Sequence, residues 1–380
     1  MTSSTSKEST KSKATTSSGQ GLEGKLSGLI FITAPRILAE NIGSAEANKA
    51  IGMVTDWGGT LCEIKPGLTA RAVLENVRPL LQADKIHGVV VLGGLDVVPS
   101  ERVNVLDDSL RDKVERMQGN DSDDFIVWSD DLFGDRDGDG FAELPVSRIP
   151  DGRKASVVLT ALASKPGKNL LRFGVRNIDR PFADAVFQSL PGTQTMRVSE
   201  PTVPESLEGL KLSGKVYFML HGMDSDGTRY WGEDGHNNTI EAIELSNLPT
   251  EADGTIVFLG CCWGGLTALP TAKRASGNFR IRPRTPEQSI AITYLAAGAN
   301  AVVGCTGTHY SPNNGNFDYY GQPMHVQFWK RLAAVSSPAK ALFEAKIEYA
   351  KQIPHAYQDP ISQAIELKIW RQYSCLGLGW

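Results

Sequence analysis

The sequence predicts an α/β fold in which mostly parallel sheets are flanked by helices. From about Gly24 onward, short apolar runs typical of buried strands alternate with segments of helical periodicity. Two of the runs end in reactive residues, the first at Leu220-His221-Gly222 and the second at Leu259-Gly260-Cys261-Cys262. Open α/β sheets bind ligands where the carboxyl ends of their strands meet, so we expect a functional site at that edge.

The elements of the first half follow in a regular order. We expect a strand at 28–33, an amphipathic helix at 68–83 and a second strand at 86–92. An acidic, turn-rich stretch covers 121–143. A helical run then covers 155–164 and ends at Lys165-Pro166-Gly167, which has the turn residues of a boundary.

The second half repeats this alternation and contains both reactive strand ends. Its best-marked helix begins at Thr285-Pro286-Glu287-Gln288, which has a capping-box pattern with proline at the first helical position. Gly298 ends that helix, and the apolar run 301–305 predicts the next strand. We therefore divide the chain into a disordered tail (1–24), an N-terminal α/β subdomain with the acidic loop (25–166) and a catalytic subdomain (167–380).

Composition excludes several classes of protein. The chain of 380 residues has 41% hydrophobic and 22% charged residues, which is ordinary for a globular protein. A net charge of -4 gives no reason to expect nucleic acid or an anionic membrane as a partner. No apolar run approaches the roughly 18 residues needed to span a bilayer. The Ser/Thr/Lys-rich start has no apolar core, and five irregularly spaced cysteines suit a reducing compartment, so we expect a cytoplasmic protein.

The histidine and the cysteines have the chemistry of a base and a thiol nucleophile. Because side chains alternate along a strand, Cys261 and Cys262 point to opposite sides, and only one can face the crevice. Cys262 lies further out and is followed by Trp263-Gly264-Gly265, where glycines allow a carbonyl group to approach closely. A free thiol has a pKa of about 8.5, so a nearby imidazole such as His221 would assist it. The backbone N–H groups of Gly222 and Cys262 could together hold an oxyanion.

One interpretation is a hydrolase with a nucleophile elbow. Gly260-Cys261-Cys262-Trp263-Gly264 matches the G-x-nucleophile-x-G pattern of α/β-hydrolases, with cysteine as in dienelactone hydrolases. That interpretation requires a catalytic histidine after the nucleophile, which leaves His309, His325 or His355. It also requires an unbroken helix directly behind the elbow, where Pro270 intrudes.

The more extensive resemblance, over roughly 86–380, is to clan CD cysteine peptidases of the gingipain-type and caspase-like CHAT families. The strand with Gly93-Gly94-Leu95-Asp96, the blocks at 129–133 and 139–150, and Tyr230-Trp231-Gly232 are similar to segments of that group. His221-Gly222 resembles its catalytic His-Gly, and 258–265 resembles its L-S-A-C-x-x-G nucleophile strand, with Cys261 in place of alanine. The segment 289–304 resembles a CHAT block, whereas Ser147 departs from the usual glycine of V-G-R.

The resemblance implies a caspase- and gingipain-like fold with two subdomains and a cysteine endopeptidase that acts on a protein or peptide. Cys262 would attack the peptide bond, His221 would transfer a proton, and the N–H groups of Gly222 and Cys262 would hold the oxyanion. It also implies a regulatory partner or activator, and it leaves a non-catalytic module that binds peptides or a partner protein as the alternative from another class. No cofactor is required for this chemistry.

Two further sets of residues are candidates for binding. Enzymes of this group that cleave after Arg or Lys have a carboxylate in the specificity pocket, and Asp179 and Asp184 are the candidates by position, with Trp231 as a further contact. Asp135-Arg136-Asp137-Gly138-Asp139-Gly140 reproduces the first half of a calcium loop, with Glu143 nearby, although position twelve is Val146. We therefore weigh a Ca2+ site formed by Asp135, Asp137, Asp139 and Glu143 against a solvated acidic turn.

Overall fold

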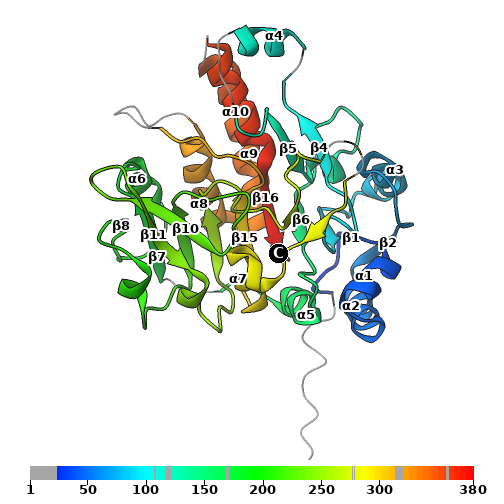
Figure 1. Cartoon of the computed structure of the whole chain (residues 1–380). Helices are drawn as coiled ribbons and strands as arrows, with labels where there is room; N and C mark the ends of the chain where they lie inside the picture. Colours follow the sequence, from blue (N-terminus) through cyan, green and yellow to red (C-terminus); the bar gives the residue numbers. More distant parts are fainter. Residues whose placement is uncertain are drawn as a thin grey trace, which may run out of the picture.

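Figure 1 shows the computed structural model of the chain. It describes residues 24–106, 108–116, 121–167, 171–275, 277, 279–312, 320–356 and 359–380. The predicted disordered tail therefore lies outside the described residues except for Gly24, which is in a turn. Within the described ranges, no helix combines the length and apolarity that crossing a bilayer requires.

The main sheet has ten strands in the order β2-β1-β3-β6-β16-β15-β12-β9-β7-β8. Its strands are β1 (Leu29–Thr33), β2 (Thr60–Glu63), β3 (Gly88–Leu92), β6 (Val146–Ile149), β7 (Arg172–Asn177), β8 (Arg197–Ser199), β9 (Lys215–Met219), β12 (Ile256–Leu259), β15 (Ala301–Cys305) and β16 (Tyr373–Gly377). Three small antiparallel pairs join β4 (Glu101–Asn104) to β5 (Ile126–Ser129), β10 (Arg229–Glu233) to β11 (Thr239–Glu244), and β13 (Ala268–Leu269) to β14 (Arg282–Pro283).

Helices cover both faces of the sheet, as the alternation in the sequence predicts. They are α1 (Pro35–Ile42), α2 (Ser44–Asp56), α3 (Ala70–Leu81), α4 (Asp108–Arg116), α5 (Ala155–Ala163), α6 (Phe182–Gln188), α7 (Ile290–Ala296), α8 (Gln322–Val335), α9 (Pro338–Ala356) and α10 (Pro360–Gln372). The capping box at Thr285 forms, but it begins a 3-10 turn, and α7 starts afterwards with Ser289 as its N-cap.

The two halves of the sheet meet at the C-terminal strand. β16 pairs parallel with β6 from the first half and antiparallel with β15 from the second half. The two halves therefore run in opposite directions, and Figure 1 shows the red strand β16 between them. The carboxyl ends of β7, β9, β12 and β15 share one edge because these four strands are mutually parallel.

Side chains of β9 and β12 alternate between two cores. Tyr217, Met219 and Phe258 pack with α6, α8, α9 and α10, whereas Phe218 and Leu259 pack with α5 and α7. These strands are apolar on both faces, which is typical of parallel strands between two helical layers. Burial on both faces holds the ends of β9 and β12 in fixed positions.

A buried arginine ties β6 to the loop that follows β3. Arg148 is 1% exposed, and its Nε and Nη2 donate to the two oxygens of Asp130, each at 2.7 Å. Its Nη1 donates to the carbonyl groups of Gly93 and Val98, and Nη2 also donates to Ser100. Burial alone would raise the pKa of Asp130, but Arg148, together with Ser100 and Lys346, outweighs burial and holds that pKa below its usual value.

Arg148→Met is expected to lower the free energy of unfolding by about 3–5 kcal/mol, because it leaves the Asp130 carboxylate buried without its partner. Since the pKa of Asp130 is lowered in the wild type, its stabilising effect is complete above the ordinary carboxyl pKa of about 3.9 and is lost as the pH falls below that value, so the deficit should shrink there. Urea unfolding at pH 7 and at about pH 3 checks this. The double variant Arg148→Met/Asp130→Asn should recover part of the loss, and an unchanged deficit would contradict the assigned role.

Candidate active site

The reactive residues come together because β9 and β12 are adjacent and parallel, with Phe218 opposite Leu259. His221 and Cys262 then follow their strands at one edge of the sheet. The backbones at this edge nearly touch, since a Cβ atom added to Gly222 would lie 2.1 Å from the carbonyl oxygen of Cys262. Only glycine allows this approach.

The two neighbouring cysteines differ in their surroundings, as strand alternation predicts. Cys261 is completely buried in the core beneath α7, whereas Cys262 is half-buried. Burial raises the pKa of Cys261 well above its usual value. Cys262 is therefore the thiol of this pair that a substrate could reach.

The thiol of Cys262 lies between two backbone segments. The N–H of His309 donates to Sγ at 3.3 Å, and the N–H of Gly222 also donates to it. Burial raises the pKa of this thiol, while these hydrogen bonds and the positive charge of Lys368 act in the opposite direction. Backbone N–H groups are the donors that stabilise an oxyanion, and two of them face this sulfur, which itself donates to the carbonyl oxygen of His309 at 3.5 Å.

The imidazole of His221 is held from one side. Its Nε2 lies 2.8 Å from Oε1 of Glu233 on β10 and 2.8 Å from Nδ2 of Asn177 at the end of β7. The two contacts require opposite roles of Nε2, so a protonated Nε2 pairs with Glu233. Because both partners approach Nε2, Nδ1 is the ring atom left for proton transfer at the crevice. The His221 side chain is 34% exposed, so it is accessible to a substrate.

A second carboxyl group lies beside this pair. A hydrogen bond to Glu233, followed by burial and the charge of Glu233, raises the pKa of Asp179. For Glu233, burial acts to raise the pKa, but Asp179, His221 and Arg180 outweigh it and lower the pKa. The pKa values of the two carboxyl groups are thus shifted in opposite directions, and the ionised form of Glu233 is favoured opposite His221.

The other residues predicted to bind substrate have different positions. Asp184 on α6 is in an ion pair with Arg176, at 2.9 Å between Oδ1 and Nε, so its charge is already partnered. Trp231 is half-buried on β10, and its backbone exchanges two hydrogen bonds with that of His221, at 2.7 and 3.0 Å. The backbone of Trp231 therefore joins the β10–β11 hairpin to the end of β9. This pairing places Glu233, two residues further along β10, beside the imidazole of His221.

The nucleophile-elbow interpretation is wrong in its geometry. Among the described residues after Cys262, a turn leads into β13 and β14, and the next α-helix is α7. Of its candidate bases, His309 and His325 are buried with their Nε2 atoms 3.1 Å apart, and burial lowers the pKa of His309 to about 3. The side chain of His355 lies outside the described part.

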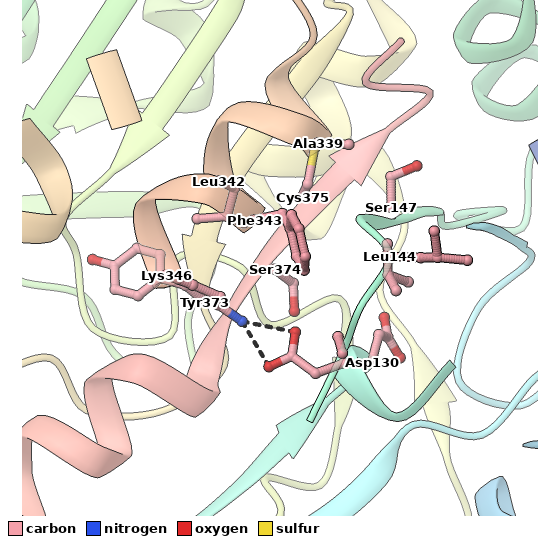
Figure 2. A pocket seen from close by; sticks show the side chains of 13 residues that line it. Asp130, Leu144, Ser147, Ala339, Leu342, Phe343, Lys346, Tyr373, Ser374 and Cys375 are labelled. Carbon is pink, nitrogen blue, oxygen red and sulfur yellow. Dashed lines mark hydrogen bonds and ion pairs between the residues drawn. The ribbon is translucent and has the colours of Figure 1, made fainter. Parts of the chain in front are cut away.

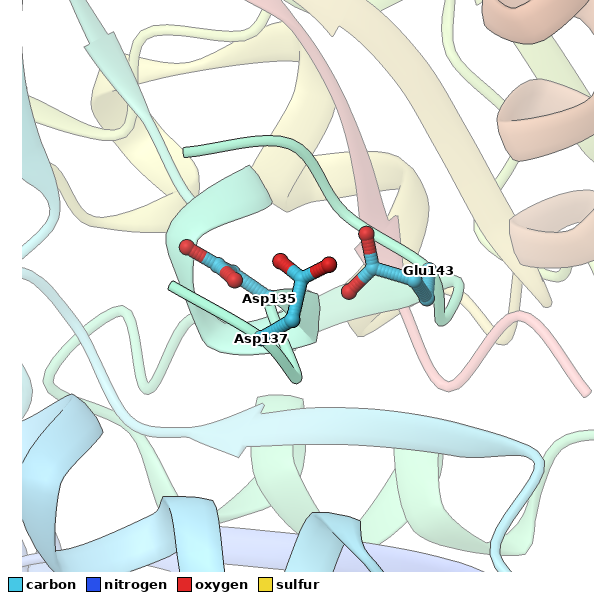
Figure 3. Close-up of side chains that lie close together, drawn as sticks. All are labelled: Asp135, Asp137 and Glu143. Carbon is cyan, nitrogen blue, oxygen red and sulfur yellow. The ribbon is translucent and has the colours of Figure 1, made fainter. Parts of the chain in front are cut away.

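The acidic loop after β5 brings together three of the four predicted calcium ligands. One oxygen each of Asp135, Asp137 and Glu143 lies within 4.8 Å of the others, and Figure 3 shows the three carboxylates side by side. Asp139 is outside this group, and its Oδ1 accepts a hydrogen bond from the N–H of Phe141 at 2.8 Å. Asp135 already accepts from two backbone N–H groups, so the loop also has the contacts of a self-contained turn.

The calcium site stays a prediction, with oxygen ligands of the type that Ca2+ prefers. Burial and the three neighbouring aspartates raise the pKa of Glu143, against a hydrogen bond from Arg136, so a cation would relieve repulsion in the loop. We expect a calorimetric titration to show binding and millimolar Ca2+ to raise the melting temperature. Asp137→Asn should abolish both effects, whereas Asp84→Asn, in the exposed turn between α3 and β3, should not. Absence of heat and of a thermal shift in the wild type would remove the site.

The sequence matches no family model and no curated protein. Solved structures do match. The crystal structure of the Arg-specific cysteine proteinase gingipain R superposes with a TM-score of 0.58 at 10% identity, over 93% of this chain and 77% of that one. The chain has the caspase-like fold of the clan CD cysteine peptidases. The predicted fold class and family resemblance are therefore confirmed at the level of fold.

Two other matches support this gingipain-type fold. The complex of the Porphyromonas gingivalis RgpB pro- and mature domains has a TM-score of 0.57 at 10% identity, over 92% of this chain and 78% of that one. A structure described as a protease gives 0.55 at 14% identity, over 94% and 78%. At these identities the likeness extends to architecture, and the chemistry has to be argued from this chain's own residues.

Sequence reasoning missed several residues of the site. Glu233 follows Trp231-Gly232 directly, and the register of β10 against His221 was needed to place it. Asn177 lies within a run that has the pattern of a strand, and nothing in that run indicates a contact with His221. Asp121 and Asp123 lie in a stretch whose pattern indicates only an acidic turn, and Lys368 lies in a C-terminal segment that has no recognisable motif.

Proposed function

We propose that the protein is a cysteine endopeptidase that hydrolyses peptide bonds through a thioester acyl-enzyme, with Cys262 as nucleophile and His221 as proton-transfer group. The observation that carries the proposal is the arrangement at the ends of β9 and β12. There the thiol of the partly exposed Cys262, an imidazole held by a carboxylate and the N–H of Gly222 lie at one edge of a gingipain-type sheet. The fold supports the proposal, because known cysteine peptidases use it.

The first half of the reaction forms the acyl-enzyme. The Cys262 thiolate attacks the carbonyl carbon of the scissile bond, and the electron pair of the C=O bond moves to oxygen. The N–H groups of Gly222 and Cys262 donate hydrogen bonds to that oxyanion. As the intermediate collapses, the C–N bond breaks, and His221 donates a proton from Nδ1 to the leaving amine while Glu233 stabilises the imidazolium.

The second half releases the acid. A water molecule gives a proton to His221 and attacks the thioester, the same N–H groups hold the new oxyanion, and the C–S bond breaks to regenerate the thiolate. No step requires a redox partner or a cofactor. The cycle starts when the Cys262 thiol gives its proton to Nδ1 of His221, which later donates it to the leaving amine. Because burial raises the pKa of the thiol, activity should increase from acid toward neutral and mildly alkaline pH.

For the cleaved position, we propose a preference for Arg or Lys, with Asp179 as the recognising carboxylate. Asp179 is exposed beside His221 and Glu233, and Arg180 is the neighbouring cation. The cluster therefore has two carboxyl groups, Asp179 and Glu233, and one guanidinium group, Arg180. A basic side chain of the substrate would neutralise the remaining negative charge. Asp184 is the weaker candidate for recognising a basic side chain, because its carboxylate is already in an ion pair with Arg176.

A panel of fluorogenic peptides with Arg, Lys, Asp or Leu at the cleaved position tests activity and preference together, with wild type and Cys262→Ala measured side by side. Cleavage after Arg or Lys that is absent in the variant is the expected result. Asp179→Asn should then raise KM for the basic substrates selectively, whereas Asp184→Asn should not. Cleavage after Asp alone would reverse the assignment and make Arg180 the recognising group. No cleavage by folded wild type would favour the peptide-binding module.

Glu233→Gln is expected to lower kcat about 10- to 100-fold with little change in KM. The amide keeps the shape of the side chain but removes the charge that orients and stabilises the imidazolium. The expected loss is therefore part of the rate enhancement of about 10²- to 10⁴-fold that general acid–base catalysis contributes. Steady-state kinetics across pH check this. Since the pKa of Glu233 is lowered, its effect in the wild type should persist well into the acid range and disappear only as the carboxylate is protonated. Glu241→Gln, on the neighbouring strand and paired with Arg229, is the matched control and should keep wild-type kcat.

A further inference from the structure

A completely buried lysine lies next to the nucleophile and has no part in the mechanism above. Lys368 on α10 is 0% exposed, and its Nζ is 2.5 Å from Oδ1 of Asp121 and 2.9 Å from Oδ2 of Asp123. Both aspartates are also buried. Burying three charged groups is costly, and cores rarely retain them without a use.

The two aspartates connect Lys368 to both sides of the thiol. Asp123 accepts a hydrogen bond from the indole Nε1 of Trp263, the residue directly after Cys262, at 3.3 Å. Its other oxygen accepts from the N–H of Thr308 at 2.6 Å. The backbone of Trp263 has a positive φ of 52°, so this side-chain anchor holds a turn that a bulky residue does not favour.

We define the thiol segment as residues 306–310, which follow β15 and include the His309 N–H that donates to Cys262 Sγ. Asp121 accepts from the hydroxyl of Tyr310 at 2.7 Å, and the ring centroid of Tyr310 lies 5.6 Å from Nζ of Lys368. α10 supports the same segment again through Gln372, whose Nε2 donates to the carbonyl of Thr308 at 3.2 Å. The segment is thus held at two residues, Thr308 and Tyr310, by α10 and the two aspartates that Lys368 binds.

We propose that Lys368, with Asp121 and Asp123, is a positioning group for the nucleophile, which fixes the turn at Trp263 and the thiol segment so that Cys262 Sγ faces the attacked carbonyl. Lys368 does not touch the reacting atoms and acts through the two aspartates. The inference rests on the proposed function for its consequence in catalysis, but the orientation and reactivity of the thiol can be measured without a substrate.

The electrostatics around the thiol agree with this geometry. The charge of Lys368 lowers the pKa of Cys262, and the charge of Asp123 raises it. Three other titratable groups lie near the thiol and are neutral at pH 7. Burial lowers the pKa of His309, and it raises the pKa values of Cys305 and Tyr310. Removing the ammonium would remove this lowering effect on the pKa of Cys262 and leave the raising effect of Asp123.

Lys368→Met is the direct test, because methionine keeps the length and apolar stem of lysine and removes the charge. We expect iodoacetamide to alkylate Cys262 about tenfold more slowly at pH 7, with the midpoint of its pH profile raised by about one unit. Mass spectrometry of the Cys262 peptide is the readout, and the other four cysteines are buried. The kcat for peptides should fall at least as much, with a matching shift in its pH profile.

A second variant separates positioning from general destabilisation. In Lys368→Met/Asp121→Asn, the asparagine oxygen can accept from the N–H groups of Asp123 and Phe125, and its NH2 can donate to Tyr310. This double variant also keeps the formal charge of the cluster. It should recover thermal stability relative to Lys368→Met while the alkylation profile stays shifted, because Asp123 remains and the ammonium does not.

The chain offers a matched control in Lys346 on α9. It is also buried and binds one aspartate, Asp131, through both oxygens at 2.8 and 2.9 Å in the cavity of Figure 2, away from the thiol. Lys346→Met should lose comparable stability and leave the Cys262 alkylation profile unchanged. A wild-type profile in folded Lys368→Met, or the same shift in Lys346→Met, would overturn the positioning role. A shifted profile in Lys368→Met, combined with peptide cleavage that survives Cys262→Ala, would instead overturn the proposed function and leave the positioning role intact.

Discussion

Cys262→Ala and His221→Ala are each expected to reduce peptide hydrolysis about 10⁴- to 10⁶-fold, to near background, because nucleophile and proton-transfer group act as a unit. Neither change should unfold the protein, since both side chains are partly exposed at the sheet edge and outside the apolar cores. Single-turnover and steady-state assays on a peptide that the wild type cleaves check the activity, and thermal unfolding checks the fold.

Cys261→Ala is the internal control for this result. Its sulfur is completely buried and faces the core beneath α7, so the variant should lose some stability and keep its activity. If Cys261→Ala were inactive and Cys262→Ala active, the nucleophile would be assigned to the wrong cysteine. If the double variant with both cysteines replaced still cleaved peptides, a thiol mechanism would be excluded.

Gly222→Ala is expected to lower kcat about 10²- to 10³-fold, the usual effect of losing one oxyanion donor. The added methyl group would lie 2.1 Å from the carbonyl oxygen of Cys262, so the ends of β9 and β12 must separate. That movement displaces the Gly222 N–H from the thiol. Pre-steady-state measurement of acylation is the direct readout, and we expect acylation to become rate-limiting.

Gly235→Ala is the matched control for this glycine. It lies in the turn between β10 and β11, and a Cβ atom there would meet nothing within 4 Å. The variant should be as active as the wild type. Wild-type acylation by Gly222→Ala would show that the two backbones can separate without cost, and that the N–H of Gly222 does not hold the oxyanion.

The fold, and the positions of His221 and Cys262 at the ends of two buried strands, could be predicted from the sequence because both depend on local patterns. Apolar runs on parallel strands mark β9 and β12 by themselves, and glycines after Leu220 and Leu259 mark the tight strand ends. The different faces of Cys261 and Cys262 follow from a period of two along the strand. The Leu68–Ala83 prediction for α3 was also close, because Thr69 caps that helix.

The remaining parts of the site depend on contacts distant in sequence. Glu233 meets His221 only because the β10–β11 hairpin folds back onto the end of β9, and a shift by one residue would place its carboxylate on the other face. Lys368 is 247 residues from Asp121, and no local pattern marks a pair at that distance. The Arg148–Asp130 pair lay inside a recognised block, but only the structure reveals that it is buried.

The arrangement of the two halves could not be predicted for a related reason. The segment Lys165-Pro166-Gly167, at which the sequence predicts a boundary between two subdomains, lies between α5 and β7. The strand that joins the halves is β16 from the end of the chain, which inserts between β6 and β15. A strand of five residues at the C-terminus has no sequence feature that distinguishes a central position from an edge.

The central claim, that Cys262 is the activated nucleophile, is tested most directly by covalent labelling with a peptidyl acyloxymethyl ketone that has Arg or Lys at the cleaved position. The intact mass should increase by one inhibitor per chain, and fragmentation should place the label on Cys262. Labelling should be lost in Cys262→Ala and strongly slowed in His221→Ala. A label on Cys261, or no label on a folded wild-type protein whose Cys262 still reacts with iodoacetamide, would contradict the account.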